Sequence, residues 1–359
     1  MPAADAGPAP LLEVLRARIR RDGPLRVDQY MQACLGDAEH GYYRTAAALG
    51  AGGDFITAPE ISQVFGELIG LWCAVVWQGM GMPAPVRLVE LGPGRGTLMR
   101  DCLRAARAMP AFVEAADVHL IEVSAPLREA QGQTLSPGAS PTWHATLDDT
   151  PPGPAIVIAN EFLDALPVRQ LVFDGGSWRE RMVDADAQGG LRFATGAVVA
   201  FDGAAAVPQQ GAIVELRAGE DALLATLARR PAPLAALFVD YGPAEFGFGD
   251  TLQAVRRHRY ADPLADPGRA DLTAHLQFET LARKAREAGF AVDGPITQGE
   301  FLGRLGAGER CARLMSANPA EAGALEAGVQ RLLSPTGMGG MFKVLAVRSP
   351  ALPPPPPFG

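Results

Sequence analysis

The chain has 359 residues, 48% of them hydrophobic, and a formal net charge of −8 at pH 7. A chain of this length and composition buries a substantial core, which predicts a globular protein with one large decorated domain or two smaller ones. The negative charge offers no global field for a nucleic-acid backbone, so nucleic acid is excluded as a predicted partner. The cysteines lie far apart without a CxxC pair, which argues against a disulfide scaffold or a zinc knuckle: Cys34, Cys73, Cys102 and Cys311.

The first 23 residues contain no continuous apolar signal core, and they are not acid-free in the way of a transit peptide. No apolar run approaches the roughly 18 residues that a membrane-spanning helix needs. The sequence therefore predicts a soluble cytoplasmic protein without membrane insertion.

The N-terminal part is predicted to be helical. Amphipathic patterns indicate helices over residues 11–21 and 27–35, and a longer apolar pattern indicates a helix over 62–77. We assign residues 1–84 to an N-terminal helical cap and lid.

From Val86 onward, short apolar runs alternate with helical patterns. Runs that are apolar on both faces indicate a parallel sheet covered by helices on both sides, and hence an α/β fold. The expected buried strands are residues 86–91, 118–123, 155–160 and 234–240. Helices near 276–288 and 320–333 and a last strand over 340–349 complete a sheet domain that we place at residues 85–349.

Two insertions interrupt this domain, at about 168–210 and 243–272. The first begins with "VRQLVFDGGSWRERMV", two alternating segments separated by Asp-Gly-Gly, which predicts a β-hairpin. The second is rich in Gly, Pro and Asp and too long for an ordinary connection, so we expect a structured lid or substrate loop. Residues 350–359 include "LPPPPPFG", which predicts an extended polyproline II tail without a backbone partner.

The stretch "ELGPGRG" joins the first predicted strand to a helix. Gly92, Gly94 and Gly96 remove side chains where a ligand contacts the backbone, and the helix that follows directs its free N–H groups and positive dipole end at that ligand. An anion or polar small molecule is expected there. The alternative is that the glycines only close a tight strand-to-helix connection.

Two acids narrow the choice of ligand. Glu122 ends the run "VHLIEVS", where a carboxylate can accept both ribose hydroxyls of an adenosine, unless it is only a solvated strand end. The glycine spacing is G-x-G-x-G rather than G-x-G-x-x-G, so the spacing specialised for a pyrophosphate is missing. Glu90 would suit the cationic methionine end of S-adenosylmethionine and repel a pyrophosphate. These residues favour S-adenosylmethionine over NAD.

The segment "NEFLDALPVRQ" places Asn160, Glu161 and Asp164 after a buried strand, at the edge where open α/β sheets bind ligands. Carboxylates there can hold a cationic acceptor such as an arginine guanidinium and orient its nitrogen toward a sulfonium methyl. We predict these three residues as catalytic. The alternative is that Asn160 and Asp164 cap a following helix.

The stretch "GGDFITAPEIS" contains Thr57 and Pro59 and is either an ordinary helix start or a loop covering the cofactor. The basic run "RRHRY" at 256–260 is expected to be a solvated or substrate-guiding loop. His119 and His144 lie in strand-like contexts and are interpreted as core or edge histidines. No cluster has metal-ligand spacing, so no metal is predicted.

The motifs "GDFITAPEISQVFGELIGLW", "LVELGPGRGTLMRDCLRA", "LIEVSAPLREAQ", "VIANEFLDALPVRQ", "FVDYG", "RADLTAH" and "RLLSPTGMGGMFKVLAV" together resemble the MidA-like class I methyltransferases. The similarity runs from roughly Leu12 to Val347 in family order. It implies a seven-stranded methyltransferase sheet with an N-terminal helical extension and S-adenosylmethionine as cofactor. It assigns the donor turn to Gly92, Gly94 and Gly96 and the ribose acid to Glu122.

The resemblance also implies an activity. The family's mitochondrial members are protein-arginine methyltransferases that assist assembly of respiratory complex I, which implies a protein substrate such as a complex I subunit. Two alternatives stay open: a methyltransferase acting on a small molecule or another side chain, and a non-catalytic assembly chaperone that retains a donor pocket.

Overall fold

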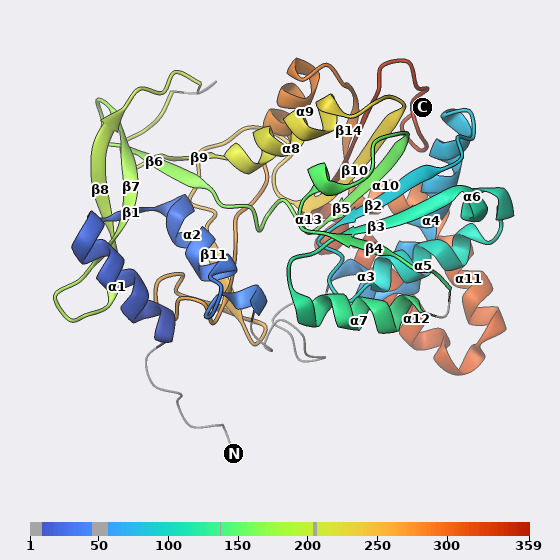
Figure 1. Ribbon diagram of the computed structural model, residues 1–359, viewed down its shortest axis with the longest axis horizontal. Coiled ribbons are helices and arrows are strands. Elements are labelled where there is room, and N and C mark those ends of the chain that lie inside the picture. Colours follow the sequence, from blue (N-terminus) through green and yellow to red (C-terminus); the bar gives the residue numbers. More distant parts are fainter. Residues whose placement is uncertain (1–8, 45–56, 137, 204–206) are drawn as a thin grey trace. The chain divides into compact units, whose positions relative to one another are not determined.

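The computed structural model describes residues 9–44, 57–136, 138–203 and 207–359. The chain divides into two compact units (Figure 1). The first unit is formed by Met1–Phe55, Asp164–Asp221 and Phe246–His275. The second unit is formed by Ile56–Leu163, Ala222–Glu245 and Leu276–Gly359.

The second unit is built on a seven-stranded sheet. Its strands, in spatial order, are β14 (Ala291–Thr297), β15 (Phe342–Arg348), β10 (Leu234–Tyr241), β5 (Ala155–Asn160), β2 (Val86–Leu91), β3 (Ala116–Ile121) and β4 (Thr142–His144). The strands from β10 to β4 are parallel, whereas β15 runs antiparallel to both of its neighbours. Every residue of β5 and β10 is buried, as expected for strands covered on both faces. The predicted α/β fold with a seven-stranded sheet is confirmed.

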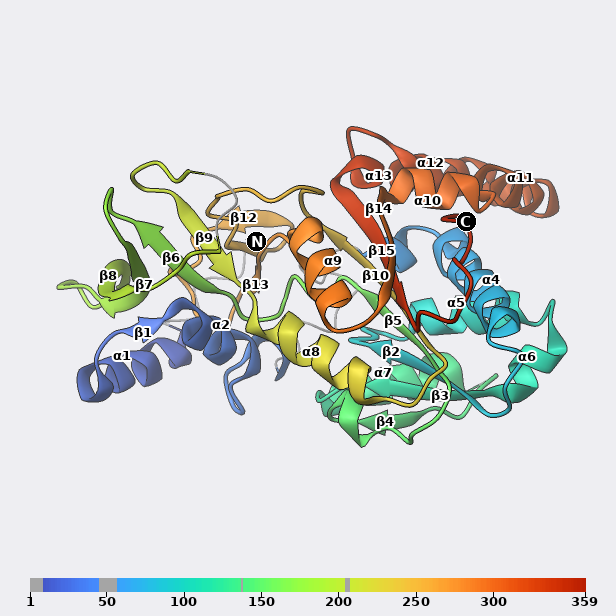
Figure 2. The same ribbon diagram turned by 90° about the horizontal axis from the view of Figure 1, so that it is seen from above.

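Helices surround this sheet. They are α3 (Ala58–Ile61), α4 (Gln63–Gly79), α5 (Thr97–Ala106), α6 (Pro110–Ala115), α7 (Ala125–Leu135), α8 (Ala218–Arg229, starting in the first unit), α9 (Phe278–Glu287), α10 (Gln298–Arg304), α11 (Ala307–Ala317), α12 (Ala322–Leu333) and α13 (Met338–Met341). The short 3-10 turns η3 (Leu147–Asp149) and η4 (Pro319–Glu321) complete the unit. Helices α10 to α13 follow one another beside β14 (Figure 2).

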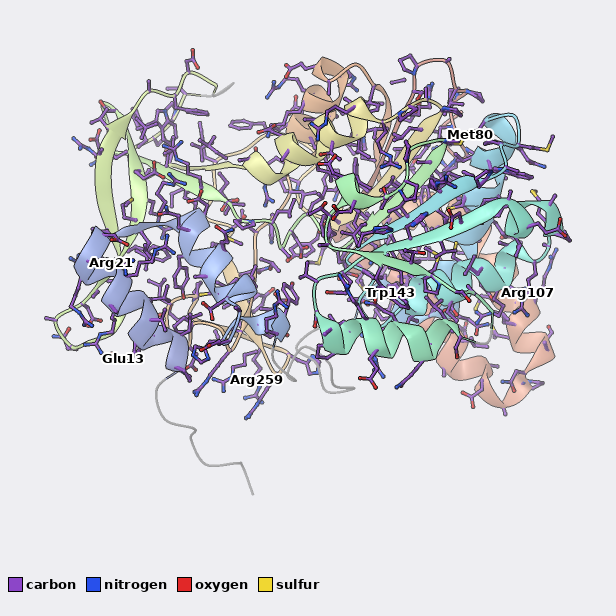
Figure 3. All side chains as sticks on the ribbon, in the orientation of Figure 1. Glu13, Arg21, Met80, Arg107, Trp143 and Arg259 are labelled. Atoms are coloured by element: carbon purple, nitrogen blue, oxygen red, sulfur yellow. The ribbon has the colours of Figure 1, made fainter. Side chains whose placement is uncertain are left out.

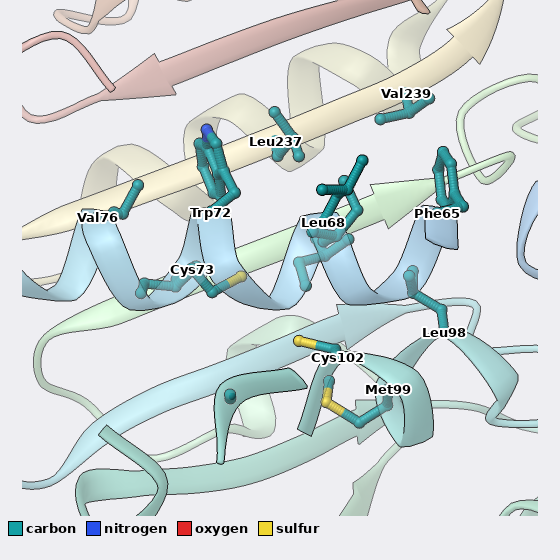
Figure 4. Close-up of a cluster of buried hydrophobic side chains, with 14 of the residues drawn as sticks. Phe65, Leu68, Trp72, Cys73, Val76, Leu98, Met99, Cys102, Leu237 and Val239 are labelled. Carbon is teal, nitrogen blue, oxygen red and sulfur yellow. The ribbon is translucent and has the colours of Figure 1, made fainter. Parts of the chain in front are cut away.

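Helix α4 packs directly on α5, the helix that follows the glycine turn. A Cβ at Gly70 would lie 2.3 Å from the carbonyl oxygen of Cys102, so the two backbones approach as closely as only glycine permits. On its other side, α4 contributes Leu68 and Trp72 to the core beside Leu237 of β10 (Figure 4). The main apolar core therefore holds α5, the helix that follows the glycine turn, against the sheet of the second unit.

The first unit contains a five-stranded sheet and a three-stranded sheet. The larger sheet has the order β1 (Leu25–Arg26), β7 (Trp178–Ala185), β6 (Arg169–Phe173) and β9 (Ile213–Leu216), with β8 (Leu191–Val199) paired to β7. The smaller has the order β12 (Arg259–Ala261), β11 (Gln253–Arg256) and β13 (Asp271–Thr273). The hairpin predicted at 168–183 is confirmed as β6 and β7, which pair antiparallel around the Asp-Gly-Gly turn.

The N-terminal helices α1 (Pro10–Asp22) and α2 (Val27–Gly36) and the 3-10 turn η1 (Tyr42–Arg44) also belong to this unit. Strand β1 pairs with β7, Leu25 opposite Val183, and Leu11 and Leu15 share a core with residues of the insertions. This grouping differs from the expected N-terminal cap over 1–84, because the N-terminal residues complete the inserted sheet while residues 57–84 join the methyltransferase-type sheet.

The C-terminal tail is not the free polyproline II segment expected from its sequence. The N–H of Phe358 donates to the carbonyl of Pro355 at 2.9 Å, and Pro355 is buried. The Phe358 ring lies 5.9 Å, centroid to centroid, from that of Phe301 in the main core. The prediction failed because it considered only backbone conformation, whereas burial of proline and phenylalanine surface holds the tail against the protein.

Candidate functional site

The glycine turn between β2 and α5 uses all three glycines in the left-handed region: φ is +61° at Gly92, +52° at Gly94 and +82° at Gly96. Side chains rarely adopt these values, so the backbone alone explains part of the glycine pattern. A Cβ at Gly92 would also lie 2.8 Å from Cδ2 of Phe162. Among the described residues, nothing lies within 4 Å of a Cβ placed on Gly94, which leaves that position facing open space.

The first turn of α5 completes this cradle. Helix α5 begins at Thr97 with Gly96 as the N-cap residue, and no side chain caps it. Its first N–H groups and the positive end of its dipole are therefore directed at the space beside the glycine turn, which suits a polar or anionic ligand group.

Glu122 lies directly after β3 and is only 8% exposed. Its Oε1 accepts the N–H of Ser124 at 2.7 Å, and its Oε2 accepts Nε2 of Gln131 at 3.3 Å. Burial raises the pKa of this carboxyl, and the donors from Ser124 and Gln131 act in the opposite direction. Glu122 is therefore a buried hydrogen-bond acceptor whose carboxylate is held by two donors, and the interpretation as a solvated strand end is wrong.

Gln131 on α7 connects this acid to the glycine turn, and sequence reasoning missed it. Its Nε2 also donates to the carbonyl of Gly94 at 2.7 Å, and its Oε1 accepts the indole N–H of Trp143 at 2.8 Å. The only sequence signal was a polar residue one turn before the end of the helix that follows Glu122.

Glu90, the second acid near the glycines, is 3% exposed on β2. Its Oε2 has no hydrogen-bond partner among the described residues, and burial raises the pKa of the carboxyl to about 8. A buried acid without a protein partner is costly, and it is the kind of group that a positively charged ligand group would pair with. The orphaned oxygen and the open space at Gly94 both fit S-adenosylmethionine.

Asn160 and Glu161 lie at the carboxyl end of β5, the neighbour of β2 in the sheet. Nδ2 of Asn160 lies 3.3 Å from Oε1 of Glu161, which also accepts the N–H of Ala58 at 3.0 Å. Glu161 is in the left-handed region, with φ of +50°, and its N–H donates to the carbonyl oxygen of Val239 at 2.9 Å. A non-glycine residue held in this conformation is typical of functional turns.

Asp240, at the end of β10, orders the turn that carries Glu161, although we did not single it out from the sequence. Its Oδ2 accepts the N–H of Leu163 at 3.0 Å, and its Oδ1 accepts the N–H of Tyr241 at 2.9 Å. Because Asp240 is almost fully buried, these charge-assisted hydrogen bonds fix the backbone after β5.

The remaining predicted site residues are Asp164, Thr57 and Pro59. Asp164 belongs to the first unit, where its carbonyl accepts the N–H of Ala274 at 3.0 Å, so its predicted catalytic role stays a prediction. The alternative of a helix cap is wrong, since residues 161–166 form turns rather than a helix.

Thr57 is the N-cap residue of α3 and Pro59 lies in its first turn, which confirms a helix start. The role of these two residues in covering the cofactor stays a prediction. Residues 52–56 of that stretch lie outside the described residues.

The other clusters behave as ordinary structural features. Nδ1 of His119 lies 3.0 Å from Nε2 of His144, between the adjacent strands β3 and β4, which agrees with their interpretation as core and edge histidines. The run at 256–260 forms the tight turn between β11 and β12. Within the described ranges, no group of three or more His, Cys, Asp or Glu residues is arranged to hold a metal, and no helix is long and apolar enough to cross a membrane.

Comparisons with known proteins agree with this geometry. The family described as S-adenosyl-L-methionine-dependent methyltransferases, Methyltransf_28, matches residues 68–296. A Burkholderia thailandensis protein, a COG1565 superfamily member crystallised with S-adenosyl-homocysteine, superimposes with a TM-score of 0.84 at 28% identity, and the match covers 96% of this chain and 93% of the Burkholderia chain. The fold and the family match thus define a class I methyltransferase.

Curated relatives are closer in sequence. The Drosophila melanogaster protein named "Protein arginine methyltransferase NDUFAF7 homolog, mitochondrial" is 36% identical over 96% of this chain and 86% of its own length. The human protein named "Protein arginine methyltransferase NDUFAF7, mitochondrial" is 36% identical over 94% of this chain and 83% of its own length. The chain belongs to this family of S-adenosylmethionine-dependent methyltransferases. The mitochondrial names of these relatives overturn the cytoplasmic location predicted from the sequence.

Proposed function

We propose that the protein methylates an arginine side chain of a protein substrate, and that this substrate is a subunit of respiratory complex I. Support for the arginine comes from the names of the curated relatives, and support for complex I from the resemblance to the MidA-like family. The structural observation that supports the proposal is the position of Glu161 in the turn next to the glycine turn. Ala159 pairs with Leu91, so β5 and β2 end side by side, and Phe162 packs against Gly92.

The donor half of the site would be formed by the glycine turn, Glu90 and Glu122. Glu122 would accept the ribose hydroxyls, and Glu90 would lie opposite the positive charge of the methionine end. When bound, S-adenosylmethionine supplies an electrophilic methyl group on a sulfonium sulfur. The protein's own contribution is to hold this group at a fixed position at the carboxyl edge of the sheet.

The acceptor half would be formed by Glu161 and Asn160. An arginine guanidinium is protonated at any physiological pH, so it needs a paired negative charge to enter a partly buried site. Glu161 provides this charge, and it receives the proton that leaves the guanidinium nitrogen as the new carbon–nitrogen bond forms. The hydrogen bonds from Ala58 and Asn160 to Oε1 would hold its carboxylate in place for both tasks.

The decisive experiment incubates the purified protein with methyl-labelled S-adenosylmethionine and a proteome from cells that lack the enzyme, and then identifies the labelled species by mass spectrometry. We expect label on arginine in a protein, with a complex I subunit among the labelled proteins. Label on a small molecule or on another side chain would overturn the arginine assignment. Absence of label, although S-adenosylhomocysteine binds, would favour a non-catalytic assembly chaperone.

A further inference from the structure

A single buried amide joins three segments around the donor cradle. Gln131 is fully buried on α7, and its side chain bonds to the carbonyl of Gly94, to the carboxylate of Glu122 and to the indole of Trp143. Figure 3 shows Trp143 beside α7. The glycine turn, the end of β3 and the strand β4 are therefore connected through one side chain.

The chemistry of the three partners fixes which way this amide faces. The indole N–H of Trp143 can only donate, whereas the carbonyl of Gly94 and the carboxylate of Glu122 can only accept. Oε1 of Gln131 must therefore face Trp143, and its NH₂ group must face the other two. A rotated amide would lose all three hydrogen bonds, so Trp143, Gly94 and Glu122 together set the orientation of Gln131.

Gln131 in turn restrains the carboxylate plane of Glu122. The two oxygens of Glu122 are held by different donors, Oε1 by Ser124 and Oε2 by Gln131. A ribose presents two neighbouring hydroxyls in a fixed geometry, and a carboxylate with a fixed plane can accept both at once. A carboxylate that is free to turn can align well with only one of them.

We propose that Gln131, oriented by Trp143, is a positioning residue that makes the donor site selective for an intact ribose diol. The proposal rests on the proposed role of Glu122 as the ribose acid. The proposal adds that Gln131 and Trp143 cause the site to bind donors lacking one ribose hydroxyl more weakly than the intact donor, although neither residue needs to contact the ligand.

The test measures, by calorimetry, the binding of S-adenosylhomocysteine and of its 2′-deoxy and 3′-deoxy analogues. In the wild-type protein, removal of one hydroxyl should weaken binding by about 10- to 100-fold, the scale of a hydrogen bond to a charged group. In Gln131→Met we expect the parent ligand to bind about tenfold more weakly, and the deoxy penalty to fall below about threefold, because Glu122 then turns toward the remaining hydroxyl. Trp143→Phe, which removes the N–H donor together with part of the ring, should also reduce the ratio between the affinities for the parent and the deoxy ligands.

Gln133→Met is the matched control, since Gln133 is exposed on the same helix and should keep wild-type discrimination. Urea unfolding of each variant separates loss of fold from loss of selectivity. A merely structural role of Gln131 would weaken all three ligands by the same factor, and this result would overturn the inference. Equal binding of all three ligands by the wild-type protein would instead overturn the role of Glu122 as ribose acid.

Discussion

Oε1 of Glu161 accepts the backbone N–H of Ala58 at 3.0 Å, which joins the turn after β5 to the first residue of α3. Glu161 reaches this contact from a left-handed backbone conformation, which costs about 1 to 2 kcal/mol for a non-glycine residue. The segment proposed to cover the cofactor and the residue proposed to hold the acceptor therefore depend on each other.

The first prediction concerns Glu161→Gln. The amide oxygen can still accept the N–H of Ala58, but it has no negative charge and cannot take a proton. We expect donor affinity to stay within about threefold and turnover to fall by about a hundredfold or more, the usual scale for a positioned proton-transfer group. Single-turnover assays on the identified acceptor, with donor affinity measured in parallel, check this.

Glu114→Gln is the matched control, because Glu114 is an exposed glutamate of α6, a helix with no proposed role in the site. Collapse of donor binding in Glu161→Gln would place Glu161 in the cofactor pocket. Turnover within about twofold of wild type would remove the support for arginine and favour a small-molecule acceptor.

The second prediction concerns the backbone amides of Ala58, Glu60 and Ile61 in α3. If α3 covers the donor, bound S-adenosylhomocysteine should slow hydrogen exchange at these amides, because local opening would then require release of the ligand. Mass-spectrometric hydrogen exchange with and without ligand measures the effect. Unchanged exchange would return this segment to a helix start without a role in donor binding.

The third prediction compares Gly94→Ala with Gly81→Ala. Both glycines have positive φ, +52° and +83°, and in both a Cβ would have no described atom within 4 Å. Both variants should therefore lose about 1 to 2 kcal/mol of stability from backbone strain. Of these two variants, only Gly94→Ala should lose donor affinity, by about tenfold or more, because the new side chain at position 94 enters the proposed donor space. The larger side chain of Gly94→Val should abolish donor binding.

Calorimetry with S-adenosylhomocysteine and thermal unfolding monitored by circular dichroism separate these two effects. Wild-type affinity in Gly94→Ala would mean that the turn serves only to connect β2 and α5.

The fourth prediction concerns Glu90 and pH. Burial raises the pKa of this carboxyl to about 8 in the folded protein, above its value in the unfolded chain. The folded state then binds more protons than the unfolded state, so stability falls as pH rises between about 4.5 and 8. Relative to Glu90→Gln, the wild-type protein should lose a few kcal/mol over this window, roughly 1.4 kcal/mol for each unit of pKa difference.

Denaturant unfolding of both proteins at pH 5, 6, 7 and 8 tests this expectation. Parallel stability curves for the two proteins would show that Glu90 is not buried in the neutral form. Ionisation of Glu90 should also affect ligand binding. As pH rises and Glu90 becomes negatively charged, the affinity for the positively charged S-adenosylmethionine should increase relative to that for neutral S-adenosylhomocysteine. This increase should be absent in Glu90→Gln.

The sequence alone was sufficient for the central strands of the second unit's sheet. These strands are short runs that are apolar on both faces, and this pattern is local, so β2, β5 and β10 were placed within one residue of their observed bounds. The strands β4 and β14, which are not buried on both faces, were not predicted from the pattern, and the number of seven strands came from the family resemblance. The glycine turn could also be predicted from the sequence, because three left-handed backbone positions within five residues favour glycine at each of them. The family resemblance added the donor and the activity.

Tertiary structure decided how these local pieces are connected. Strand β1 has two residues and no signal of its own, yet its pairing with β7 brings the N-terminal helices into the first unit. Gln131, Trp143 and Asp240 each bond to a partner in another element of the fold, and hydrogen bonds between separate elements leave no periodic pattern in a single chain. Glycine spacing and strand periodicity are local properties that one sequence displays, whereas the partner of a buried polar side chain is set by which elements pack together.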